Sequence, residues 1–120
     1  IESTLEYVYR RDVERAHGLP VGRRNISVSR STRTDVVYED YGVLVELDGR
    51  LGHEDAESVF RDLNRDNIHI LSGKPTLRYG NADVRVQSCL AARQVGTLLG
   101  NRGWPGPVKA CPRCLALMAS

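Results

Sequence analysis

The chain has no long apolar segment and no strong excess of charge of either sign. No stretch approaches the ~20 apolar residues that a membrane-spanning helix needs. No basic start followed by an apolar middle marks a signal peptide. Its 17 basic and 15 acidic residues leave a net charge of +2, which excludes a polycationic nucleic-acid binder. We therefore expect a soluble globular protein without a membrane partner.

Cysteine is scarce and odd in number, with three residues in the whole chain. An odd count argues against a secreted disulfide framework, so we expect a cytoplasmic protein. With 120 residues, 41% apolar and 27% charged, the chain has the size and composition of one domain with a modest core. It begins with Ile1 rather than Met, which suggests a fragment of a longer chain or a processed one.

Hydrophobic periodicity predicts helices on the outside of a group of strands. A helix is expected over 3–17, with Ser3 and Glu6 as a capping box and Gly18 at its end. Strands are expected at 25–31, 33–38, 42–47 and 76–79, and a turn at 39–42 should make the middle two a hairpin. Further helices are expected over 54–71 and 88–102. This α-β-β-β-α-β-α order predicts an α/β domain with a mixed sheet flanked by helices.

Three acids near the end of that hairpin are the most informative residues. If the chain turns at 39–42, Asp35 and Glu46 face each other across the two strands. Asp48 lies two residues beyond Glu46 and shares its face, because side chains alternate along a strand. Hard divalent cations prefer carboxylate oxygens, and such an ion can activate water beside a phosphate. The pattern favours a Mg²⁺ or Mn²⁺ site, whereas a different register would turn some of these acids to solvent.

Two further residues have competing structural and chemical roles. His53, just before the long helix, is a candidate general base because a neutral imidazole accepts protons near physiological pH. A lone histidine is also common on a surface or as a cap. Glu6 either closes the first helix as part of the capping box or assists the acidic cluster, and the local sequence favours the cap.

Basic residues precede the acids along the chain. Acids concentrate in 35–66, whereas the segment 10–33 is rich in arginine. A basic flank beside an acidic pocket suits an enzyme that follows a phosphate backbone and binds metal. Solvated surface charge is the alternative, and the same choice applies to Arg61, Asp62, Arg65 and Asp66 on the long helix.

The tail over 105–120 carries the motif Cys111-Pro-Arg-Cys114, which has the spacing of a zinc knuckle. Cys89 is a third candidate ligand, because the chain between the last predicted helix and Cys111 is long enough to return to it. His17, His69 and water are candidates for the fourth position. A structural Zn²⁺ would attach this tail to the main domain, 1–104; free thiols and redox chemistry are the alternatives.

Several short motifs together resemble a known family. The span 3–84 that they mark looks like the DUF559 family, relatives of the very-short-patch repair (Vsr) endonuclease in the PD-(D/E)XK restriction-endonuclease-like superfamily. The resemblance implies a restriction-endonuclease-like three-layer core. The motifs are Ser3-Thr-Leu-Glu6, Arg33-Thr-Asp35-Val36, Val45-Glu46-Leu47-Asp48-Gly49 followed by His53, Asp62 with Arg65-Asp66-Asn67, and Leu77-Arg78-Tyr79-Gly80.

The resemblance also implies a role for each site residue. Asp35 matches the family's principal metal-binding aspartate, and Glu46 and Asp48 match its acid-x-acid strand end. His53 matches a histidine proposed as the base in the Vsr group. Glu6 matches a helix glutamate that orders metal-bound water. The implied activity is that of a Mg-dependent endodeoxyribonuclease that nicks or cleaves its partner, DNA.

The chain departs from the family in ways that leave an alternative open. The superfamily's strand ends in acid-x-Lys, whereas Asp48 stands in the lysine's place, and the zinc ligands that the Vsr enzyme has nearby are absent. Family members are also often joined to a DNA-binding winged helix. The alternative is a catalytically inactive nucleic-acid-binding or regulatory, antitoxin-like domain, with an additional N-terminal DNA-binding domain or partner protein. A third interpretation is a zinc-stabilised interaction module with purely structural acids.

Overall fold

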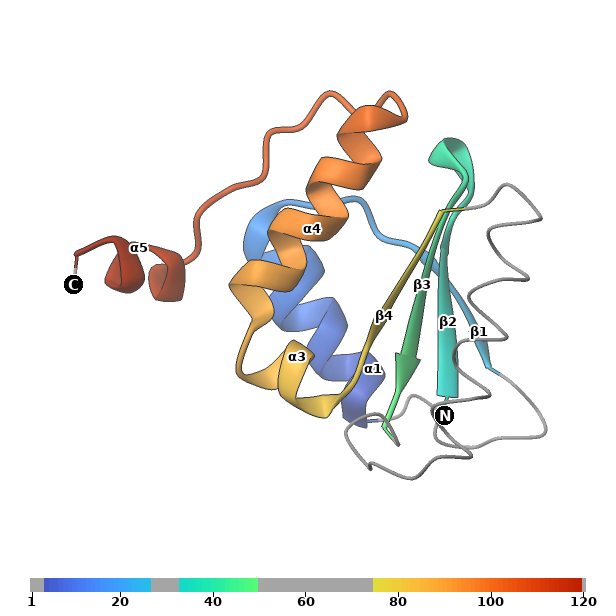
Figure 1. Ribbon diagram of the computed structural model, residues 1–120, viewed down its shortest axis with the longest axis horizontal. Helices are drawn as coiled ribbons and strands as arrows, with labels where there is room; N and C mark the ends of the chain where they lie inside the picture. The colour runs from blue at the N-terminus through green and yellow to red at the C-terminus, as the bar shows by residue number, and fades with distance from the viewer. Residues whose placement is uncertain (1–3, 27–32, 50–74, 120) are drawn as a thin grey trace.

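The computed structural model describes residues 4–26, 33–49 and 75–119 (Figure 1). The expected helix over 54–71, with His53 and His69, lies outside these ranges. The described elements, in chain order, are α1 (Thr4–Val8), the π-helix η1 (Tyr9–Arg15), β1 (Arg23–Ile26), β2 (Arg33–Tyr38), the 3₁₀ turn η2 (Glu39–Tyr41), β3 (Val43–Asp48), β4 (Thr76–Tyr79), α3 (Asn81–Arg85), α4 (Ser88–Asn101) and α5 (Pro112–Ala119).

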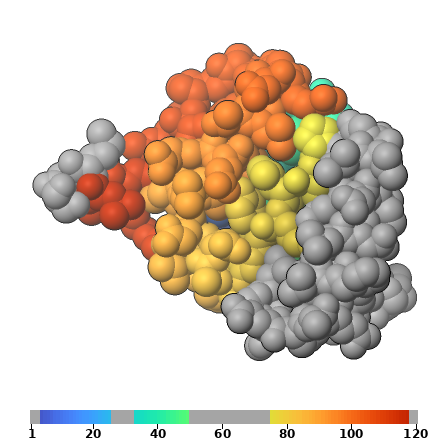
Figure 2. All heavy atoms as spheres, in the orientation of Figure 1, coloured from blue at the N-terminus to red at the C-terminus, as the bar shows by residue number. Residues whose placement is uncertain are grey.

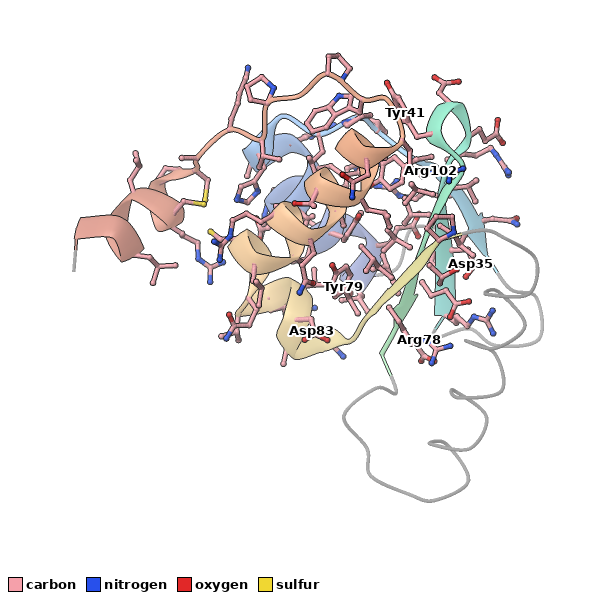
Figure 3. All side chains as sticks on the ribbon, turned by 45° about the horizontal axis from the view of Figure 1, so that its top comes forward. Asp35, Tyr41, Arg78, Tyr79, Asp83 and Arg102 are labelled. Atoms are coloured by element: carbon pink, nitrogen blue, oxygen red, sulfur yellow. The ribbon has the colours of Figure 1, made fainter. Side chains whose placement is uncertain are left out.

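The four strands form one mixed sheet in the order β1-β2-β3-β4. β1, β2 and β3 are antiparallel neighbours, and β4 runs parallel to β3. The hairpin between β2 and β3 closes at Gly42, whose φ of 65° is in the left-handed region that glycine enters without steric cost. At the far end of α4, Arg102 Nε donates to the Tyr41 carbonyl at 2.7 Å and ties that helix to the turn (Figure 3). The α/β class and the central hairpin are thereby confirmed.

The register of the hairpin follows from alternating burial. Val36 of β2 pairs with Val45 of β3, and the next pair along is Asp35 with Glu46. Because neighbouring residues of a strand point to opposite faces, the valines lie on one face of the sheet and the acids on the other. The predicted Asp35–Glu46 pairing is therefore confirmed.

The first helix with η1, α3 and α4 covers the apolar face of the sheet (Figure 1). Removal of this apolar surface from water is the main stabilising force of the domain. Gly96 of α4 lets the tail approach closely, since a Cβ at that position would lie 2.2 Å from Cγ2 of Val108. The second flank expected of a three-layer core falls on residues outside the described ranges. The core includes Leu5, Val8, Tyr9, Val13, Val36, Val43, Val45, Leu47, Val84, Ala91, Ala92, Val95 and Leu99.

Several element boundaries differ from the predictions. The first helix ends at Gly18 as expected, but its middle is a π-helix rather than an α-helix. β1 begins two residues early, at Arg23, and α4 ends one residue early, at Asn101. The short helices α3 and α5 were not predicted. α5 begins at Pro112, and proline is favoured in a first helical turn. Within the described ranges, no helix is long and apolar enough to cross a membrane.

Candidate functional site

The sheet face opposite the helices carries a group of charged residues from three strands. Asp35 pairs with Glu46, Arg33 pairs with Asp48, and Glu46 also pairs with Arg78 of β4. Figure 3 shows Asp35 and Arg78 on this side of the sheet, whereas Tyr79 points toward the helices. We call this group the acid–arginine cluster; its members are Arg33, Asp35, Glu46, Asp48 and Arg78.

Glu46 is the central carboxylate of the acid–arginine cluster, and its side chain is 0% exposed. Arg78 Nε donates to Oε2 of Glu46 at 3.0 Å, and Arg33 Nη2 lies 3.6 Å from its Oε1. Arg33 Nε also lies 3.7 Å from Oδ1 of Asp35. The two Arg33 contacts are longer than hydrogen bonds and act as ion pairs. Burial of a carboxylate costs free energy unless the carboxylate is paired with a cation. Arg33 and Arg78 therefore stabilise the buried carboxylate of Glu46.

The acid–arginine cluster combines two kinds of ligand chemistry on one face of the sheet. Its carboxylates are the oxygen donors that hard divalent cations prefer. Its guanidinium groups present forked N–H donors that match phosphate oxygens. Two opposed carboxylates repel each other in the absence of a cation, and Arg33, which contacts both Asp35 and Glu46, offsets that repulsion. The cluster therefore places oxygen ligands for a cation beside N–H donors for an anion.

The three acids share a face without forming a closed cage of carboxylates. Among the described residues, one group of at least three His, Cys, Asp or Glu side chains has its ligand atoms close enough together to hold a metal ion. That group, described below, does not include Asp35, Glu46 or Asp48. Mg²⁺ is commonly bound by only one or two carboxylates, with waters and substrate phosphates completing its shell. The adjacent pair Asp35 and Glu46 meets that requirement.

Glu6 belongs to a different buried network, on the helix-facing side of the sheet. Its Oε1 lies 3.7 Å from Nε of Arg24 in β1. The same arginine donates through Nη2 to Oε1 of the fully buried Glu14 at 2.6 Å. Ser3 lies outside the described ranges, so the capping box stays a prediction. Glu6 is buried, which an exposed helix cap would not require.

Glu14 is the centre of this second network, which the sequence did not reveal. Its Oε2 accepts hydrogen bonds from the Tyr38 hydroxyl at 2.6 Å and from the Gly22 amide at 3.0 Å. The Tyr38 and Tyr9 hydroxyls lie 2.8 Å apart. These contacts join the first helix to β1 and β2. We call the group the Glu14–Arg24 network; its members are Glu6, Tyr9, Glu14, Gly22, Arg24 and Tyr38.

Buried tyrosines give the folded protein a specific response to alkaline pH. Burial and nearby charge raise the pKa of Tyr9 and Tyr38 well above the usual 10.0, and burial raises the pKa of Tyr79. A pKa raised by folding adds stability below the unfolded value, and that stability is lost as pH rises through the folded value. We expect stability to fall above about pH 10, with these three of the five tyrosines ionising only on unfolding. Ultraviolet titration alongside circular dichroism checks this, and ionisation of all five in folded protein would contradict it.

The three cysteines meet His17 on the α5 side of the helices. Cys89 lies in the first turn of α4, Cys111 directly precedes α5, and Cys114 is in its first turn. The Sγ–Sγ distances are 2.9 Å for Cys89–Cys114 and 3.5 Å for the other two pairs. His17 Nε2 lies 3.3 Å from Cys114 Sγ. The predicted approach of Cys89 to the knuckle is confirmed, and this buried cluster can hold a metal ion.

The thiols of this cluster differ in acidity. Burial, together with hydrogen bonds to the other two thiols, raises the pKa of Cys89 to about 12. Burial opposes ionisation of Cys111 as well, but N–H groups of Cys114 and Arg113 bond to its sulfur and lower its pKa below the usual value. Backbone N–H groups of the knuckle therefore stabilise a thiolate at Cys111.

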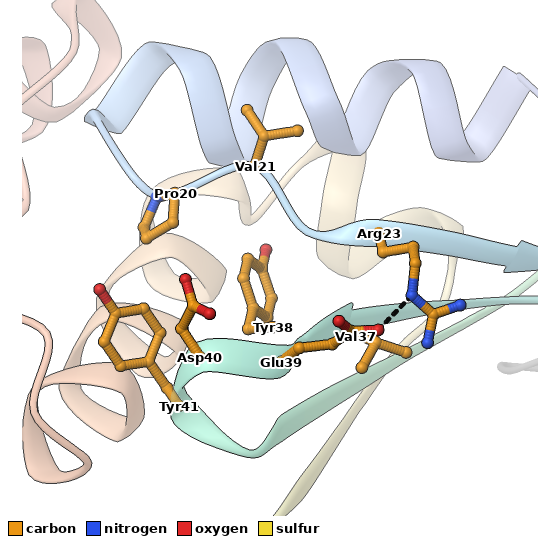
Figure 4. A pocket seen from close by; sticks show the side chains of 8 residues that line it. All are labelled: Pro20, Val21, Arg23, Val37, Tyr38, Glu39, Asp40 and Tyr41. Carbon is orange, nitrogen blue, oxygen red and sulfur yellow. Dashed lines mark hydrogen bonds and ion pairs between the residues drawn. The ribbon is translucent and has the colours of Figure 1, made fainter.

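Two open cavities lie away from the acid–arginine cluster. One, of about 190 Å³, lies beside the hairpin turn and is lined by Pro20, Arg23 and Tyr41 among others. Figure 4 shows the ion pair between Arg23 and Glu39 in its wall. The other, of about 610 Å³, lies between α4 and β4, over Leu77 and Leu98. Neither is lined by a member of the acid–arginine cluster.

Comparison with protein-family models, with curated proteins and with solved structures finds no match to this chain. Function is therefore inferred from the residues of the acid–arginine cluster and from the sequence motifs around them.

Proposed function

We propose that the protein is a metal-dependent DNA endonuclease, a cytoplasmic enzyme of the Vsr-like, restriction-endonuclease-like class. The observation that carries this proposal is the fully buried Glu46, paired in register with Asp35 and in contact with Arg33 and Arg78. The sheet supports it too, because a central hairpin followed by a parallel strand is the mixed sheet that the resemblance implies.

In this proposal Asp35 and Glu46 are the ligands of Mg²⁺ or Mn²⁺, with Asp48 as an additional oxygen donor. A bound ion of this kind lowers the pKa of water and stabilises the charge that develops on the phosphate. Arg33 and Arg78 exchange their carboxylate partners for phosphate oxygens when DNA binds, since guanidinium–phosphate contacts are strong and forked. Such contacts position the DNA backbone without reading its sequence.

One predicted role completes the proposed site: His53 is the general base, and it lies outside the described ranges. Glu6, the residue predicted to order the attacking water, belongs to the Glu14–Arg24 network on the other face of the sheet and is not part of the proposed site. Because Asp48 occupies the place of the superfamily's lysine, no amine assists the water at this position.

The proposal is tested by nicking of supercoiled plasmid in Mg²⁺, in Mn²⁺ and in EDTA. We expect the wild type to nick in either metal and Asp35→Asn to lose about 100-fold or more of that activity. Asp40→Asn is the matched control, because Asp40 is an exposed acid of the same hairpin away from the cluster, and it should nick like the wild type. Nicking that survives in EDTA, or that is equal in Asp35→Asn and wild type, would disprove the proposal.

The alternative function is a catalytically inactive nucleic-acid-binding or regulatory domain. It is favoured by one observation, that Arg33 and Arg78 already neutralise the charge of Glu46. A domain of this kind would shift DNA in a gel without cutting it in either metal. Asp35→Asn would then bind DNA as tightly as the wild type.

A further inference from the structure

We propose that His17, Cys89, Cys111 and Cys114 form a closed site for one structural Zn²⁺, which fastens the C-terminal segment to the first helix and to α4. The inference concerns a different part of the molecule from the proposed nuclease site and does not depend on it. Its new element is His17, which supplies the fourth ligand and brings a third segment of the chain into the site.

The spacing of the four ligand atoms is close to that of a zinc tetrahedron. With Zn–S bonds of about 2.3 Å and a Zn–N bond of about 2.0 Å, tetrahedral geometry separates two sulfurs by about 3.8 Å and a sulfur from the nitrogen by about 3.5 Å. Two of the Sγ pairs are 3.5 Å apart and the third is 2.9 Å apart. Nε2 of His17 is 3.3 Å from the nearest sulfur. A small outward movement of the side chains admits the ion.

A contact behind His17 orients this ligand toward the thiols. Nδ1 of His17 lies 3.1 Å from the Val13 carbonyl, so that nitrogen is the donor and the lone pair of Nε2 faces the thiols. A metal-binding histidine typically donates its other ring N–H to a carbonyl in this way.

The composition and burial of the site match a structural zinc rather than a catalytic one. Structural sites are closed by four protein ligands, and three cysteines with one histidine are a common set. His17, Cys89 and Cys111 are buried, and Cys114 is partly buried. Thiolate and imidazole ligands also discriminate against Mg²⁺, which prefers oxygen donors. This site and the acid–arginine cluster therefore select different metals.

Packing alone gives the C-terminal segment little stability, so a metal site there would have a structural role. α5 stands out from the body of the molecule (Figure 2), and its Leu115 and Leu117 are 57% and 69% exposed. A segment that buries so little apolar surface gains little stability from packing. Two of its polar contacts lie beside the ligands: the Lys109 amide donates to the His17 carbonyl at 2.8 Å, and Arg113 donates to the Ser88 hydroxyl at 3.1 Å.

The test measures metal content and ligand geometry in the full chain. Elemental analysis should find one zinc per chain, and Co²⁺ exchanged into the site should give the intense visible bands of tetrahedral coordination with a thiolate charge-transfer band. His17→Ala should lose most of the zinc, whereas His17→Cys should retain one metal and raise the charge-transfer intensity by about one third, from three thiolates to four. His69→Ala is the matched control and should bind like the wild type. Removal of zinc by a chelator should lower Tm by about 10 °C or more.

Two results would overturn the inference. One is a wild-type chain that carries almost no zinc and shows a Cys89–Cys114 disulfide by mass spectrometry, which would identify a redox pair. The other is equal zinc content and equal Co²⁺ spectra in wild type and His17→Ala, which would exclude His17 as a ligand. If His17→Ala fails to fold, His17→Cys still decides the point. Because none of these measurements uses DNA, loss of the nuclease proposal leaves their outcome unchanged.

Discussion

Replacement of Glu14 by alanine is expected to destabilise the domain by about 3–5 kcal/mol, the typical effect of removing one partner from a buried ion pair. Glu14 is fully buried and accepts hydrogen bonds from Arg24, Tyr38 and the Gly22 amide. The substitution leaves the Arg24 guanidinium, whose side chain is only 14% exposed, with Glu6 at 3.7 Å as its remaining acidic neighbour. It also leaves the buried Gly22 amide without its acceptor, and an unsatisfied donor of this kind costs about 1–3 kcal/mol.

Urea denaturation followed by circular dichroism measures this effect. Glu14→Gln keeps the volume and some hydrogen bonds but removes the charge, so it should lose roughly half as much stability. Glu39→Gln is the control, because Glu39 pairs with Arg23 at a site where both side chains are more than half exposed, and such a pair contributes at most about 1 kcal/mol. If Glu14→Ala and Glu39→Gln differ by less than about 1 kcal/mol, the Glu14–Arg24 network does not hold the first helix to the sheet.

The sheet was predictable because its signals are local. The turn at 39–42 contains the glycine that the left-handed conformation requires, and alternation in β2 and β3 then determines which residues face each other. The Asp35–Glu46 pair follows from those two facts alone. β4 was predicted with its observed bounds, and α4 to within one residue. Proline or glycine residues that interrupt regular structure lie next to both elements.

The Glu14–Arg24 network was not predictable, because it is made by residues far apart in the sequence. In a π-helix the backbone bonds run from residue i to i+5, and Tyr9 and Glu14 have this spacing within η1. Both therefore face the sheet and reach Tyr38. An α-helical projection of the same segment uses a different period and gives no reason to bury Glu14. The irregular helix thus turns a charged residue into part of the core.

The fourth member of the cysteine cluster was also beyond local inference. The sequence spacing predicted that Cys89, Cys111 and Cys114 could lie together, because the tail is long enough to return to Cys89. It left His17 and His69 equally open. Only the packing of the first helix beside α4 places His17 next to Cys114. Metal ligands that come from separate helices depend on tertiary structure, whereas a Cys-x-x-Cys pair is visible in the sequence itself.

The two faces of the sheet now divide the charged residues by role. On the helix-facing side, Glu14 has a full set of protein partners and is explained as a structural element. On the other side, Glu46 is equally buried and lies directly opposite a second acid in the adjacent strand. A second acid does not by itself distinguish the two groups, because Glu6 and Glu14 also share one arginine, Arg24. The direct cross-strand pairing of Asp35 with Glu46 is the feature on which the nuclease proposal depends, and a variant of Glu46 can distinguish a metal ligand from a structural ion pair.

Glu46→Gln tests that distinction, and we expect it to affect both stability and metal response. Removal of the Glu46 charge leaves Arg33 and Arg78 facing a neutral amide, which should cost about 3 kcal/mol of stability in the absence of metal. Arg78→Gln should also destabilise the protein. The double variant should lose less than the sum of the two, with a coupling of about 1–3 kcal/mol, because each single change breaks the same contact. Urea denaturation in EDTA provides these values.

The response to Mn²⁺ then separates a structural ion pair from a metal site. A ligand that binds only the native state raises stability by an amount that grows with its concentration. The Tm of the wild type should therefore rise as Mn²⁺ is added. The Tm of Glu46→Gln, of Asp35→Asn and of the double variant Glu46→Gln/Arg78→Gln should stay unchanged, even though the double variant loses less stability than the sum of its two single changes. Asp40→Asn should respond as the wild type does. If the double variant regains the Mn²⁺ response together with its stability, Glu46 serves only to neutralise the arginines, and the metal ligands must lie elsewhere.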